Sequence, residues 1–113
     1  MTVIPLPQAK AELFRTLGHP VRIRVLELLQ ERPRPVHELL VEIEVEPSNL
    51  SQQLAVLRRA GLVASSRDGS TVLYTLSTPD VADLLRSARG ILTAMLSGQE
   101  DLLAQLRAVV EVR

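Results

Sequence analysis

The sequence contains no cysteine and no tryptophan, and its 113 residues include one phenylalanine and one tyrosine. The lack of cysteine excludes disulfides, thiolate metal sites and thiol-based redox sensing. With so few aromatic residues, the core must be built from Leu, Val, Ile and Ala. We expect a single small domain over residues 1–113 that gains stability by pairing with a second copy.

The chain also lacks net charge, because 13 Lys and Arg residues balance 13 Asp and Glu residues. This balance argues against a histone-like protein that binds nucleic acid through bulk charge. The two histidines, His19 and His37, form no pattern with a nucleophile, and no glycine-rich phosphate loop is present. We therefore predict no enzyme activity and no cofactor. There is no basic-then-apolar leader and no apolar run of about 18 residues, so the expected location is the cytoplasm.

What the sequence does contain is an amphipathic helix predicted over residues 49–60. Leu50, Leu54 and Leu57 have the spacing that places them on one buried face. The other positions form a polar surface around one small residue: Ser48, Asn49, Ser51, Gln52, Gln53, Ala55 and Arg59. Such a surface suits the major groove of DNA, where amides and hydroxyls meet base edges and phosphates. Ser48 is the expected N-cap and Gly61 the expected terminator.

A hairpin is predicted directly after this helix, over residues 62–76. Two β-prone runs flank an Asp-Gly dipeptide, which is a strong hairpin signal. The predicted tip carries Arg67, Gly69, Ser70 and Thr71, a composition suited to contacts with phosphate or the minor groove. An ordinary surface hairpin is the alternative.

These motifs resemble a known family. The stretch SNLSQQLAVLRRAGLV followed by the Asp-Gly hairpin, together with TLGHPVRIRVLELL upstream, is similar to the winged helix-turn-helix of the ArsR-type (arsenic-repressor) bacterial transcriptional regulators. The resemblance covers residues 9–96. It implies a mainly α, dimeric fold with a small β-hairpin, in the order α-α-α-α-β-β-α. It also implies DNA contacts at the start of the recognition helix, at Ser48, Asn49, Ser51 and Gln52. Gln53 takes a position that is often histidine in the family and is retained as a DNA-binding candidate.

The residues before this unit are predicted to form an arm and two helices. Residues 1–8 contain Pro5 and Pro7 and are expected to form the arm, with a helix following over residues 9–17. His19-Pro20 opens a second helix, since proline suits a first helical position. On that helix we expect Arg22 and Arg24 to form ion pairs or remain solvated rather than bind phosphate. Residues 36–60 are predicted to form the helix-turn-helix.

A broad apolar stripe is predicted along the C-terminal helices, over residues 79–110. A Ser-x-x-Glu capping pattern at residues 97–100 predicts a break or bend there. We interpret the stripe as a dimer interface that packs with the helix over residues 9–17, and a stand-alone helical cap is the alternative. The predicted interface residues are Leu13, Phe14, Leu17, Leu84, Leu85, Ala88, Ile91, Leu92 and Met95.

No metal site is predicted. The metal sensors of the resembled family use a cysteine pair near residues 40–44 or Asp and His residues on the C-terminal helix, and this sequence has no cysteine or histidine there. Glu38, Glu42, Glu44 and Glu46 are expected to form a solvated face.

The sequence thus predicts a homodimeric repressor that binds double-stranded DNA at an inverted-repeat operator. Its effector would be a small molecule or a protein, with no membrane partner. The alternative is a winged-helix module that binds a protein and not DNA.

Overall fold

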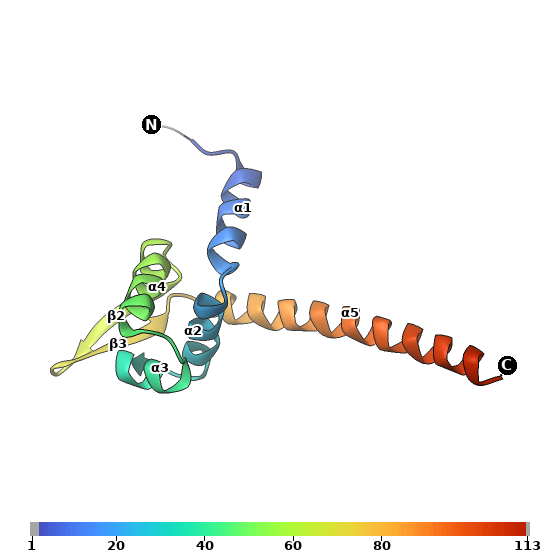
Figure 1. Cartoon of the computed structure of the whole chain (residues 1–113). Helices are drawn as coiled ribbons and strands as arrows, with labels where there is room; N and C mark the ends of the chain where they lie inside the picture. The colour runs from blue at the N-terminus through green and yellow to red at the C-terminus, as the bar shows by residue number, and fades with distance from the viewer. Residues whose placement is uncertain (1–2, 113) are drawn as a thin grey trace. The chain divides into compact units, whose positions relative to one another are not determined.

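The computed structural model describes residues 3–112, with side chains described through residue 108. Within these residues the chain has five helices and three short strands (Figure 1). In chain order these are α1 (Leu6–Leu17), α2 (Pro20–Glu31), β1 (Arg34–Pro35), α3 (Val36–Glu42), α4 (Pro47–Arg59), β2 (Val63–Asp68), β3 (Thr71–Leu76) and α5 (Pro79–Val112). The prediction of a mainly helical chain with a small β-hairpin is confirmed.

The chain divides into two compact units, and the boundary falls inside α5, after Ala82. The buried hydrophobic core belongs to the first unit, where α2 packs against α4 and β3. Leu26, Leu39, Leu50, Leu54 and Leu57 are its largest fully buried leucines. Three of these lie at the spacing that predicted the buried face of α4, so the amphipathic assignment of that helix is confirmed.

Prolines lie in the first turn of four helices, α1, α2, α4 and α5. α1 begins at Leu6 rather than at residue 9, with Pro7 in its first turn, so the arm is shorter than expected. Residues 1–2 of that arm lie outside the described residues. α2 begins at Pro20, and the backbone N–H of Val21 donates to Nδ1 of His19 over 3.2 Å. Proline is tolerated in a first turn because its missing N–H would have no helical partner.

The recognition helix α4 also begins at a proline, which corrects the predicted cap. Pro47 is its first residue, so Ser48 lies inside the helix and is not the N-cap; Glu46 takes that place without a side-chain cap. The other end is as predicted. Gly61 has a φ of +79°, and the N–H groups of Gly61 and Leu62 donate to the carbonyls of Arg58 and Leu57, each over 3.0 Å. This is the Schellman arrangement that ends a helix at a glycine.

The predicted hairpin is present as β2 and β3, paired from Val63 opposite Leu76 to Asp68 opposite Thr71. Gly69 and Ser70 form the connecting turn, in which Gly69 has a φ of +66°. A positive φ confined to the first of two turn residues fits the type II′ turn that favours glycine there. Figure 1 shows the hairpin extending away from the helices of the first unit, so its turn forms a projecting wing.

A third strand was not predicted. In β1, Arg34 pairs with Tyr74 and Pro35 pairs with Leu73, so β3 is the central strand of a three-stranded sheet. The segment Arg32-Pro33-Arg34-Pro35 contains two prolines, which in the sequence indicate a break between two helices and no strand. A two-residue strand has no periodicity to detect, and a proline favours a break, although it is tolerated on an edge strand.

The predicted break near Ser97 is absent, because α5 runs without interruption from Pro79 to Val112 (Figure 1). A capping box requires a non-helical residue at the N-cap, and Ser97 is helical. Gly98 lowers the stability of the helix by only about 1 kcal/mol relative to alanine, and most residues around it are good helix formers. In the described part of the chain, no helix combines the length and apolar character needed to cross a bilayer.

Candidate nucleic-acid interface

The outward face of α4 carries four of the predicted DNA-binding side chains. Ser48, Ser51, Gln52 and Arg59 are exposed, and Ala55 lies among them as the one small residue. This surface offers amide and hydroxyl groups that can both donate and accept hydrogen bonds, with a guanidinium at the C-terminal end. Such groups at the exposed start of a recognition helix are suited to base edges and phosphates.

Gln53 departs from the predicted arrangement. It is only 9% exposed and faces the interior of the unit. Its Oε1 accepts a hydrogen bond from Nε of Arg22 over 2.8 Å, and its Nε2 donates to Oδ1 of Asn49 over 2.9 Å. Both polar groups of its amide thus have partners within the protein. Gln53 is therefore not expected to touch DNA directly, in contrast to the prediction.

Arg22 was not identified from the sequence as part of this site. It was expected to form an ion pair or remain solvated, whereas it donates to Gln53 on α4 and, through Nη1, to the backbone carbonyl of Thr16 over 3.2 Å. It therefore connects the end of α1 to the recognition helix. No sequence signal joins Arg22 to Gln53, because they lie 31 positions apart.

The predicted wing residues lie together at the turn of the hairpin. Arg67 is exposed near the end of β2, Gly69 and Ser70 form the turn, and Thr71 begins β3. This places one cation, two hydroxyls and the turn's backbone N–H groups at the projecting end of the wing. Such donors are suited to phosphate oxygens.

Two of the four glutamates before α4 form ion pairs. Nη1 of Arg32 lies 2.7 Å from a carboxylate oxygen of Glu38, and Nη2 of Arg24 lies 4.0 Å from one of Glu42. Arg24 therefore matches the ion-pair expectation. Among the described residues, no group of three or more His, Cys, Asp or Glu side chains could hold a metal ion.

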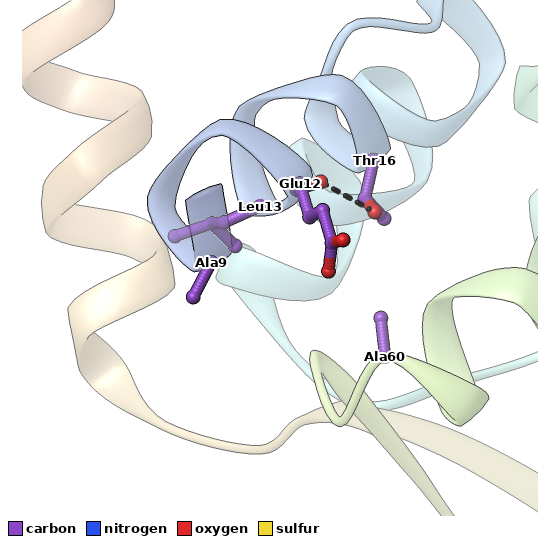
Figure 2. Close-up of a pocket in the computed structure, with 5 residues that line it drawn as sticks. All are labelled: Ala9, Glu12, Leu13, Thr16 and Ala60. Carbon is purple, nitrogen blue, oxygen red and sulfur yellow. Dashed lines mark hydrogen bonds between the residues drawn. The ribbon is translucent and has the colours of Figure 1, made fainter. Parts of the chain in front are cut away.

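A hollow of about 250 Å³ lies between α1 and the end of α4. Figure 2 shows its lining residues, Ala9, Glu12, Leu13, Thr16 and Ala60. The Thr16 hydroxyl donates to the backbone carbonyl of Glu12 over 3.0 Å. The Glu12 carboxylate is the one charged group of the lining. The hollow is smaller than the 300–1,000 Å³ common for drug-sized ligands and offers little apolar surface. It therefore gives no support to the small-molecule effector that the sequence left open beside a protein effector.

Comparison with known proteins identifies the family. The family model for the bacterial regulatory protein, arsR family, matches residues 19–65. The HTH-type transcriptional regulator Rv0081 of Mycobacterium tuberculosis is 55% identical over 105 residues, which cover 92% of each protein. The chain belongs to the ArsR family. It is therefore a transcriptional regulator with a winged helix-turn-helix DNA-binding fold, like its relatives, which are not enzymes.

Solved structures agree with this assignment to the ArsR family. The crystal structure of Rv0081 matches with a TM-score of 0.80 and covers 86% of this chain and 98% of that one. The transcriptional repressor BigR from Xylella fastidiosa is 35% identical, with a TM-score of 0.67 over 79% of this chain and 88% of its own. The homodimeric winged helix-turn-helix DNA-binding domain Mb0332 from Mycobacterium bovis, 23% identical, shares the fold, with a TM-score of 0.70 over 82% of this chain and 91% of its own.

The predicted dimer residues of this ArsR-family regulator differ in exposure. Phe14, Ile91, Leu92 and Met95 are between 56% and 62% exposed, which is unusual for large apolar side chains. Leu13 is less exposed than these four, Leu84 and Leu85 are half-buried, and Ala88 is exposed. Leu17 differs from the prediction, because at 8% exposure it belongs to the core of the chain and offers little surface to a second copy.

Proposed function

We propose that this regulator is a homodimeric repressor that binds an inverted-repeat operator in double-stranded DNA. The observation that carries the proposal is the exposed polar face of α4, from Ser48 to Arg59, beside a wing whose end carries Arg67. Each chain has one such helix, so a two-fold dimer presents two of them to two half-sites. The repressor role rests on relatives such as BigR, and a cytoplasmic location follows from the proposed role.

The apolar face of α5 supports the proposed homodimer. Ile91, Leu92, Met95 and Leu96 are all more than half exposed, and α-helical spacing places them on one face. Leu102, Leu103 and Leu106 continue that face and are also exposed. An apolar strip of this length in water favours association with an equally apolar partner, and a second copy supplies one. Phe14 on α1 is the proposed additional contact.

The proposed signal is not a metal bound in the manner of the family's metal sensors. The chain has no cysteine, and its two histidines precede α4. One equivalent of zinc, cadmium or arsenite should change the affinity for DNA by less than about twofold, because no thiolate or imidazole set is available to couple metal binding to DNA release. Fluorescence anisotropy with and without each metal measures this. A weakening of about tenfold or more would contradict the proposal.

The decisive experiment is selection of duplexes from a random-sequence DNA library with the purified full chain. We expect an inverted repeat whose half-site centres are about 10 to 20 base pairs apart, because recognition helices of a dimer enter grooves one or two turns apart. Sedimentation of the protein with the selected duplex should give two chains per duplex.

The alternative, a protein-binding module, makes the opposite prediction. It would yield no enriched sequence, and substitutions on the polar face of α4 would have no effect on binding to its partner. An enriched direct repeat, or one chain per duplex, would support DNA binding but contradict the proposed two-fold dimer.

A further inference from the structure

A chain of hydrogen bonds leads from Arg22 on α2, through the buried Gln53, to the start of the recognition helix. Nε of Arg22 donates to Oε1 of Gln53 over 2.8 Å, and Nε2 of Gln53 donates to Oδ1 of Asn49 over 2.9 Å. Gln53 is 9% exposed, whereas Asn49 is half-buried and lies in the first turn of α4. The chain of bonds therefore begins at a cation and ends at the surface proposed to face DNA.

The chemistry of these groups fixes the direction of every bond. A guanidinium only donates, so Gln53 must present its oxygen to Arg22. The nitrogen of Gln53 then points the other way, and it can only donate, so Asn49 must present its oxygen inward. Arg22 is itself held by its second bond to the carbonyl of Thr16, over 3.2 Å. A reversal of either amide would place two donors or two acceptors together.

We infer that Arg22 and Gln53 are positioning residues that hold Asn49 with its Nδ2 amide directed outward, so that Asn49 donates to a hydrogen-bond acceptor on the operator. The inference rests on the proposed function. Among the described residues, no side chain or carbonyl accepts from Nδ2 of Asn49, whose amide is bonded through its oxygen alone, so this group is free for a ligand. The acceptor is either a base edge, such as O6 or N7 of guanine or O4 of thymine, or a phosphate oxygen.

The orientation of the Asn49 amide disfavours one common base contact. An asparagine that reads adenine uses its oxygen and its nitrogen together, on N6 and N7. Here the oxygen is turned toward Gln53, so the bidentate adenine contact is disfavoured at Asn49. Gln52, which is exposed and takes no part in this chain of bonds, retains both groups for such a contact.

The test uses the duplex that the native chain enriches from a random-sequence library, and the variants Asn49→Ala and Gln53→Glu in the full chain. The carboxylate introduced by Gln53→Glu still accepts from Arg22 but cannot donate to Asn49. Asn49 would then turn its nitrogen inward and its oxygen outward. Gln53→Glu should therefore weaken binding by about tenfold, as Asn49→Ala does, although residue 53 is buried. Gln30→Glu, on the exposed face of α2, is the charge-matched control.

A double-mutant cycle separates positioning from general damage. In the Asn49→Ala background, Gln53→Glu should change affinity by less than about twofold, because its effect passes through Asn49. An equal loss in both backgrounds would overturn the inference. Circular dichroism melting of each variant checks that the fold is retained, and Arg22→Lys, which keeps the charge but not the Nε donor geometry, should reproduce the loss.

Two further measurements distinguish the source of the acceptor. If the acceptor is a base, repeated selection with Gln53→Glu should change the preference at one position of each half-site toward a base that donates. If that acceptor is N7 of guanine, 7-deazaguanine at the same position should remove the effect of Asn49→Ala. If the acceptor is a phosphate, a methylphosphonate at one position of the duplex should remove the effect of Asn49→Ala. The base preference selected by Gln53→Glu should then be unchanged. An Asn49→Ala variant that binds the selected duplex with native affinity would overturn this inference alone, whereas a library with no enriched duplex would overturn the proposed function as well.

Discussion

At the residue scale, the exposed groups of α4 and of the wing differ in what they can recognise. An amide on a helix that enters the major groove can distinguish bases, because each base pair presents its own pattern of donors and acceptors there. A guanidinium at the end of a wing meets phosphates, which are the same at every position. Gln52 and Arg67, both exposed, represent the two classes.

Gln52→Ala should weaken binding to the selected operator by about 1 to 3 kcal/mol and relax the preference at one base position. The physical reason is the loss of an amide that can pair in two ways with a base edge. Competition binding against operators with single base changes measures both effects. An unchanged ranking of those operators would contradict the assignment of Gln52 as a base reader.

Arg67→Ala should weaken binding to all sequences by a similar factor. It should also reduce the slope of log K against log salt by about one unit, because one phosphate contact fewer releases one counterion fewer. Titrations at several salt concentrations with operator and random DNA measure this. Loss confined to the operator would instead place Arg67 at a base edge.

At the scale of single elements, two glycines have opposite roles in their helices. Gly61 ends α4 with a φ of +79°, whereas Gly98 lies within α5, and an added Cβ there meets no atom within 4 Å. The first position requires a conformation that other residues rarely adopt, and the second only lowers helix propensity.

Gly61→Ala should therefore destabilise the first unit by about 1 kcal/mol or more, because alanine is strained in the left-handed conformation. Gly98→Ala should stabilise the surrounding turns of α5 by about 1 kcal/mol, which slows amide hydrogen exchange there roughly fivefold. Urea unfolding measures the first effect and native-state hydrogen exchange the second. Faster exchange in Gly98→Ala would indicate a bend at Ser97 in solution.

At the scale of the whole molecule, the proposed homodimer depends on how two chains meet. Leu92 is 56% exposed on the apolar face of α5, so a charge there should not disturb the fold of a single chain. Leu92→Glu should place two carboxylates in the proposed interface and shift the chain toward monomers at micromolar concentration, with loss of the tight operator complex. Light scattering gives the mass, and anisotropy gives the affinity.

Ser97→Glu is the matched control for Leu92→Glu, because helical spacing places Ser97 on the opposite, polar face of α5. It should remain dimeric and bind DNA as the native chain does. A monomeric native chain would contradict the proposed homodimer, and a Leu92→Glu variant that is still dimeric would place the interface elsewhere.

The sequence by itself determined the elements with clear periodicity or strong local signals. Leucine spacing predicted the buried face of α4, the Asp-Gly pair predicted the hairpin, and His19 with Pro20 predicted the start of α2. Gly61 marked the end of α4. These features depend on neighbours within a few residues, so the sequence contains all the information that they need.

Only the tertiary structure decided the features that join distant residues. The pairing of Arg34 with Tyr74 in β1, and the bonds that link Arg22, Gln53 and Asn49, depend on which elements pack together. The burial of Gln53 follows from the same packing, since a polar residue at the edge of an apolar face becomes internal only when a partner such as Arg22 meets it. Hydrogen bonding to a distant residue offsets the cost of burying an amide, and no local sequence pattern predicts which residue that partner is.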